Sequence, residues 1–237
     1  MRRLIPFALL ASAWLALGAR AAPPDQPPPG RAPAPRPEQA KANAAGALTS
    51  AYETVAAASA GVRGEGDDKE LGRLLDAARD LYRNADKAYK DGAYDRAAGT
   101  AMAADAAASG VMLTLQANAG KLAGLPAPPT DALGLPPPPP GAAVTTRPPA
   151  GADAPKNSGD FVQDLLKHTG ERLDQAKGEK GPGATFLDAA RKALDQAKQA
   201  QKDGDAFKAV ELAHAADAWA EVGELLRQAE QPAPNNR

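Results

Sequence analysis

The chain has 237 residues, a net charge of −1 and a large share of alanine among its apolar residues. The nearly balanced charge gives no electrostatic reason to expect nucleic acid or an anionic membrane as a partner. The absence of cysteine excludes disulfides, thiolate nucleophiles, zinc–thiolate and iron–sulfur sites, and lipid modification of an N-terminal cysteine.

The N-terminus has the three parts of a secretory signal peptide. Residues 1–3 are positively charged, residues 4–17 are apolar, and Ala19 and Ala21 flank Arg20 in a small-x-small cleavage site. The apolar run is shorter than the roughly 20 residues that a spanning helix needs. We expect cleavage after Ala21 and a mature periplasmic or extracellular protein with no membrane span; an uncleaved N-terminal anchor is the alternative.

The first part of the mature chain is predicted to be a proline-rich lead followed by a helical unit. Residues 22–37 are rich in proline and cannot bury a core, so we expect a disordered spacer. Apolar residues then recur at helical spacing over 38–60, from an N-cap at Asp67 to Gly92, and from Ala93 to about residue 118. We assign residues 38–125 to this first helical unit.

A second proline-rich stretch separates this unit from another. Residues 126–157 contain five consecutive prolines and predict a disordered, partly polyproline linker that marks a domain boundary. The second helical unit, residues 158–230, has predicted N-caps at Ser158 and Thr185 and a third helix after Gly204. Residues 231–237 are expected to fray as a disordered tail.

The two units share a duplicated stretch. Residues 75–105 align with residues 187–217 without a gap, and about half of the aligned positions are identical. Each copy reads as a helix, a Lys-Asp-Gly turn and a second helix, with Gly92 and Gly204 as the helix stops. Alanine favours helix over strand. We therefore predict an all-α fold of two duplicated three-helix antiparallel bundles joined by the disordered linker.

The turn of the first copy resembles a tetratricopeptide repeat. Gly92-Ala-Tyr94-Asp-Arg-Ala97 matches the Gly-x-Tyr-x-x-Ala start of the second helix of that motif. In the second copy the aromatic residue is Phe207, one place late, and the copies lie 112 positions apart, whereas tetratricopeptide units repeat every 34 residues or so. The resemblance implies a scaffold that binds peptides.

Few residues suggest chemistry. No nucleophile elbow, Walker loop or zinc-protease motif occurs, so we expect no enzymatic activity and no cofactor. His214, with Glu211 one turn before it and Asp217 one turn after it, is a candidate for a metal site. The alternative is an ordinary helix-surface histidine, which the methionine at the equivalent position, Met102, favours.

Each copy also has an arginine 13 positions before the helix stop and an aspartate 13 positions after it. Because a helix rises about 1.5 Å per residue, the two charges of each copy should lie at the same height along an antiparallel hairpin. We therefore predict two structural cross-helix pairs, Arg79–Asp105 and Arg191–Asp217. The alternative is that all four charges are solvated independently.

Three functions follow from these features. The first is a non-enzymatic, exported interaction or spacer protein, whose two modules engage an unknown envelope or extracellular protein. The second is a small-molecule or metal-binding protein that uses the second unit, and the third is a structural or stress-related protein without a specific ligand. Lean alanine-rich cores gain burial from docking or dimerisation, so we also consider a homo-oligomer.

Overall fold

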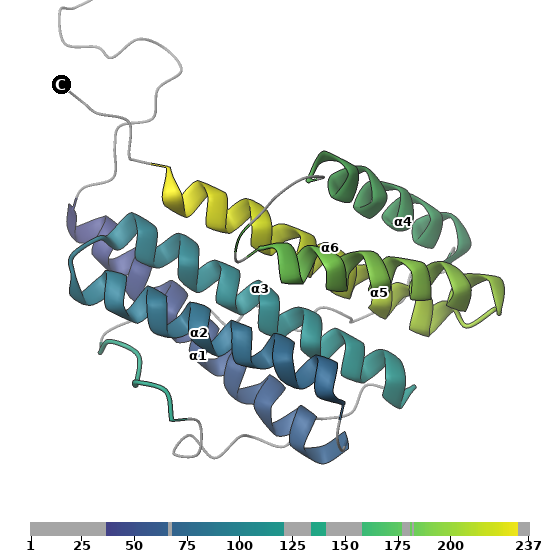
Figure 1. Ribbon diagram of the computed structural model, residues 1–237, viewed down its shortest axis with the longest axis horizontal. Helices are drawn as coiled ribbons and strands as arrows, with labels where there is room; N and C mark the ends of the chain where they lie inside the picture. Colours follow the sequence, from purple (N-terminus) through teal and green to yellow (C-terminus); the bar gives the residue numbers. More distant parts are fainter. Residues whose placement is uncertain are drawn as a thin grey trace, which may run out of the picture. The chain divides into compact units, whose positions relative to one another are not determined.

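The computed structural model describes residues 37–65, 68–120, 134–140, 158–176, 181 and 183–231. Within these ranges it contains α-helices and no strand, so the prediction of an all-α protein is confirmed (Figure 1). The helices are α1 (Pro37–Glu65), α2 (Lys69–Lys90), α3 (Tyr94–Ala119), α4 (Ser158–Gln175), α5 (Ala184–Lys202) and α6 (Ala206–Glu230). The predicted signal peptide, nearly all of the proline-rich lead and most of the linker and tail lie outside the described residues.

Aspartates cap the starts of α2 and α6, whereas α5 begins at Ala184 after Gly183 with no side-chain cap, so the N-cap predicted at Thr185 is wrong. The N-cap of α2 is Asp68, one residue after the predicted Asp67, and its carboxylate accepts hydrogen bonds from the backbone N–H groups of Glu70 and Leu71. Asp205 caps α6 in the same way by accepting from the N–H of Lys208. Two successive aspartates offer two registers for one cap, which explains the shift in α2.

The helix ends show which glycines break a helix. Gly92 and Gly204 adopt left-handed φ values of 77° and 80° directly after α2 and α5. In each turn the glycine N–H and the next N–H bond back to carbonyls in the last helical turn, which is the Schellman arrangement. Helix α1 instead continues past Gly61, beyond the predicted end near residue 60. A helical glycine costs only about 1 kcal/mol, which the packing of α1 can offset.

The helices form two hairpins, α2–α3 and α5–α6, with one further helix packed on each. Helix α1 contacts both α3 and α2, and α4 contacts both α6 and α5. The most extensive contact between any two described helices, however, joins the hairpins through α3 and α6. Buried hydrophobic residues from all six helices belong to one continuous cluster.

We call the contact between α3 and α6 the seam, and the two helices run antiparallel along it. Gly99 near the start of α3 lies against Ala229 near the end of α6, and Gly110 further along α3 lies against Trp219. The Trp219 indole N–H donates to the backbone carbonyl of Ala107 at 3.1 Å. Because the facing residues are mostly alanine and glycine, the backbones can approach closely enough for one tryptophan to fill the space between them.

Helix α3 lies at the centre of this arrangement, which accounts for its composition. It is the one helix of the described residues that is long and apolar enough to cross a membrane by length and composition, and 61% of its most apolar window is buried within the protein. Helices α1, α2 and α6 all pack against it. We call α1–α3 the first helix set and α4–α6 the second. The unit boundaries predicted at 38–125 and 158–230 remain predictions, since the packing of α3 on α6 does not show whether either helix set folds alone.

Candidate functional site

A short piece of the predicted linker rests on the first three helices. We call residues 134–140, a glycine and a leucine followed by five prolines, the proline segment. The hydroxyl of Tyr82 on α2 donates to the carbonyl oxygen of Pro136 at 2.8 Å, and Leu135 packs against the main hydrophobic core. Figure 1 draws the segment as a separate teal trace beside the helices. This piece of the predicted linker thus contacts the helices, and the rest of residues 126–157 lies outside the described residues.

The exposure of the proline segment repeats every three residues. Leu135 and Pro136 are half-buried and Pro137 is exposed; Pro138 and Pro139 are again half-buried, and the last proline is exposed. Each proline fixes its own φ and pushes the residue before it into an extended conformation. A run of prolines therefore adopts polyproline II, which has three residues per turn. The pattern is that of one side of such a helix lying on a surface.

Tyr82 is the fixed donor on that surface. Its ring is fully buried and lies 5.8 Å from the ring of Tyr52 on α1, tilted by 55°. Burial raises the pKa of Tyr82, and the nearby Asp86 and Tyr52 raise it further. The hydroxyl therefore keeps its proton at physiological pH and donates it to a carbonyl. Asp86 is itself held by Lys90 one turn later, at 2.6 Å.

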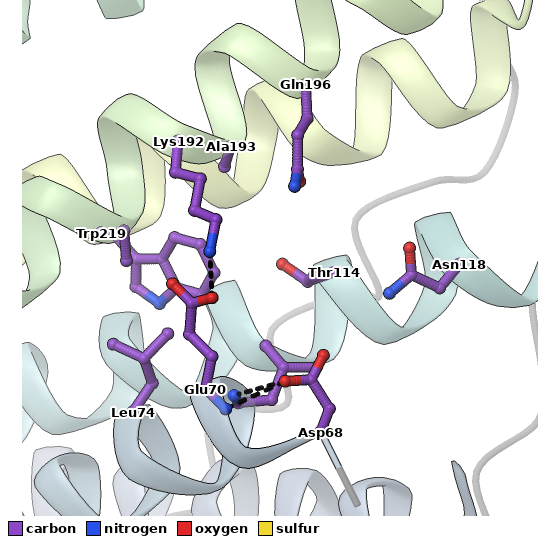
Figure 2. Close-up of a pocket in the computed structure, with 11 residues that line it drawn as sticks. Asp68, Glu70, Leu74, Thr114, Asn118, Lys192, Ala193, Gln196 and Trp219 are labelled. Carbon is purple, nitrogen blue, oxygen red and sulfur yellow. Dashed lines mark hydrogen bonds and ion pairs between the residues drawn. The ribbon is translucent and has the colours of Figure 1, made fainter. Parts of the chain in front are cut away.

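A second candidate is a small cavity where the two hairpins meet (Figure 2). It has a volume of about 100 Å³ and is lined by the start of α2, the end of α3, one side of α5 and Trp219. Glu70 of α2 and Lys192 of α5 both line the cavity and form an ion pair. Sites for small-molecule ligands usually measure about 300–1,000 Å³, so this space suits a few waters and the ion pair joins the hairpins.

The residues around His214 face different partners. The His214 ring lies 6.3 Å from the ring of Phe161 on α4, and burial lowers the pKa of His214, with the charge of Asp217 opposing the shift. Asp217 accepts from Arg172 of α4 at 2.9 Å. Glu211 is buried, and burial raises its pKa. Among the described residues no three potential ligands form a group that could hold a metal ion.

The predicted cross-helix pairs are not brought together in the first hairpin. Arg79 donates instead to Asp76, one turn earlier on α2, at 2.8 Å and to Ser59 of α1 at 3.0 Å. Asp105 accepts hydrogen bonds from Ser50 and Thr54 of α1 at 3.3 Å and 2.5 Å. Both charges thus turn toward α1, which packs across the hairpin.

The second hairpin differs from the prediction in the same way. Arg191 pairs with Asp188, one turn earlier on α5, at 3.0 Å, and Asp217 pairs with Arg172 of α4. The count of 13 positions from the glycine gave a height along the hairpin. It did not give the direction in which each side chain points, and it left out the third helix and the carboxylate one turn away.

Sequence reasoning also missed the residues that hold the two candidate sites. Tyr82, Trp219 and Lys192 each contact a partner distant in sequence: Pro136, Ala107 and Glu70 respectively. The restriction of all four tyrosines to the first helical unit was the one available signal for the surface around Tyr82.

Comparison of the chain with protein-family models, curated proteins and solved structures finds no match. The likeness of its turn to tetratricopeptide repeats therefore has no support from a family match. A function for the chain must therefore be inferred from its own sequence and from the described residues.

Proposed function

We propose that the chain is a non-enzymatic, exported protein of the cell envelope that acts through contacts with other proteins. The observation that carries this proposal is the extended segment seated on its helices, where Tyr82 donates to the carbonyl of Pro136. A surface that holds an extended peptide by a buried donor and an apolar contact has the elements of a peptide-binding site. Export is inferred from the charged, apolar and small-x-small parts of residues 1–21.

The α3–α6 seam supports the same proposal. The aromatic side chains of the two helix sets differ: all four tyrosines lie in α1–α3, whereas α4–α6 carry the exposed Phe161, the half-buried Phe207 and the buried Phe186 and Trp219. A scaffold whose halves have diverged in their bulky side chains can present different surfaces to partners, with the spacing between them fixed by the seam. An interaction or spacer role uses both properties.

The test is site-specific photocrosslinking in the intact envelope of cells that make the full chain. A photoreactive phenylalanine replaces Tyr89, two helical turns from Tyr82 on the same stripe of α2. The matched control replaces Phe161, an exposed aromatic residue of α4. We expect one dominant crosslinked protein from position 89, little from position 161, and a recovered chain that begins at Ala22. No crosslinked protein from either position, or a chain that stays in the cytoplasm with residues 1–21 intact, would contradict the proposal.

A further inference from the structure

We infer that the surface around Tyr82 is a recognition site for polyproline II segments, occupied here by the chain's own residues 134–140. This inference rests on the proposed function and names the class of partner. The partner is a protein with an exposed leucine followed by a run of prolines. Such a segment would displace the proline segment and bind in its place.

The chemistry of the contact favours this class of ligand. Prolines in such a run have no N–H, and a polyproline II helix makes no internal hydrogen bonds, so its carbonyls remain available to an outside donor. Tyr82 supplies a donor that is buried up to its hydroxyl and remains protonated. The segment is also ordered in advance by its prolines, so binding costs it little conformational entropy.

The apolar part of the contact fixes the register. Leu135 inserts against the core beside the bonded carbonyl of Pro136, and one turn later Pro138 and Pro139 again face the protein. A ligand therefore needs a leucine immediately before the prolines and at least four prolines after it. A glycine-rich or randomly coiled segment would present neither the period of three nor the leucine.

The site belongs to one helix set only. In the gapless alignment of the duplicated stretch Tyr82 corresponds to Leu194, which is buried and has no hydroxyl to donate. The proline run occurs once, between the two sets. Because the equivalent hairpin α5–α6 forms without such a tyrosine or a proline segment, the hairpin fold itself does not require either of them.

The experiment measures binding of a labelled peptide of residues 134–140 by fluorescence anisotropy. The receptor is the chain from Ala22 in which residues 134–140 are replaced by a glycine–serine run of the same length. We expect saturable binding to this chain. The native chain should bind with an apparent affinity about tenfold weaker if its own segment fills roughly nine tenths of the sites, because only the open fraction can bind the peptide. Tyr82→Phe in the replaced chain should weaken binding about three- to tenfold by removing one hydrogen bond. Tyr94→Phe, whose ring packs on Tyr89, is the matched control and should leave binding unchanged.

Two altered peptides distinguish recognition of one side of the polyproline helix from an effect of the peptide's stiffness alone. Alanine at Pro138 and Pro139, the half-buried pair, should weaken binding more than alanine at the exposed positions 137 and 140, although each peptide loses two prolines. No saturable binding to the replaced chain, or equal losses from the two peptides, would overturn the inference.

The outcomes also distinguish this inference from the proposed function. Peptide binding without any crosslinked envelope protein would retain the site and refute the interaction role. A crosslinked partner whose capture is unaffected by Tyr82→Phe, together with no peptide binding, would retain the interaction role and refute the polyproline site.

Discussion

Replacing Gly110 by alanine probes the α3–α6 seam with a single methyl group. A Cβ atom at this position would lie 2.3 Å from Nε1 of Trp219 and 2.6 Å from two carbons of the indole, whereas carbon contacts are comfortable at about 3.5–4.0 Å. The indole has little freedom to move because it is 3% exposed and donates to the carbonyl of Ala107. The methyl group must therefore push the helices apart or displace the ring.

The expected effect is opposite in sign to that of the same change in an open helix. Gly→Ala inside a helix stabilises a protein by about 0.5–1 kcal/mol, and Gly72→Ala in α2 should do so because a Cβ there meets nothing within 4 Å. Overpacking a well-filled core costs about 1–3 kcal/mol, and a buried indole N–H left unpaired costs about 1–3 kcal/mol more. Gly110→Ala should thus be less stable than the native chain by about 0.5–2 kcal/mol, and by more if the hydrogen bond breaks.

Urea unfolding followed by far-ultraviolet circular dichroism measures both variants. Gly72→Ala should raise the urea midpoint and Gly110→Ala should lower it, with an unchanged dependence of the unfolding free energy on urea. If Gly110→Ala is as stable as Gly72→Ala, then Trp219 is not seated on Gly110 and the description of the seam is wrong.

Three further predictions concern titratable and charged residues of α6. Burial raises the pKa of Glu211, so its ionisation costs stability as pH rises through that raised value. Glu211→Gln should therefore be more stable than the native chain at pH values above the raised pKa and no different below about pH 4 in urea titrations. Burial lowers the pKa of His214 below 6.5, so native stability should fall as pH drops below that value, and His214→Gln should lose this part of the pH dependence. A double-mutant cycle on Arg172 and Asp217, whose side chains are 30% and 29% exposed, should give a coupling of about 0.2–1 kcal/mol; the cycle on Arg191 and Asp217 should give none, and the reverse result would reinstate the pair predicted from the sequence.

The helices could be predicted closely because the signals for their ends are local. An aspartate at the N-cap or a glycine that accepts a positive φ acts on its own turn. The stops at Gly92 and Gly204, and the start of α2 to within one residue of the predicted Asp67, therefore need no knowledge of the rest of the fold. The error at Gly61 has the same origin, since a glycine ends a helix only if the tertiary structure does not favour continuing it.

Contacts between distant parts could not be predicted in the same way. Helix α3 has small apolar residues on most of its sides, so its periodicity does not show which side meets α1, α2 or α6. Trp219 and Ala107 lie 112 positions apart, the same offset that relates the duplicated stretches. Trp219 thus packs against the position equivalent to its own, which holds a small alanine. Aligning the two copies pairs these residues but does not show that they are in contact. Docking of the proline segment likewise depends on one hydroxyl whose position follows from the tertiary fold.

The claim that α3 and α6 join the six helices into one body is tested most directly by unfolding the chain from Ala22 with two probes. In this chain Trp219 is the sole tryptophan, so its emission reports on the seam while far-ultraviolet circular dichroism reports on all the helices. Because the indole is buried between α3 and α6, the two urea curves should coincide in one cooperative transition. Two separated transitions, with a large part of the helical signal lost while Trp219 emission stays native, would contradict the claim.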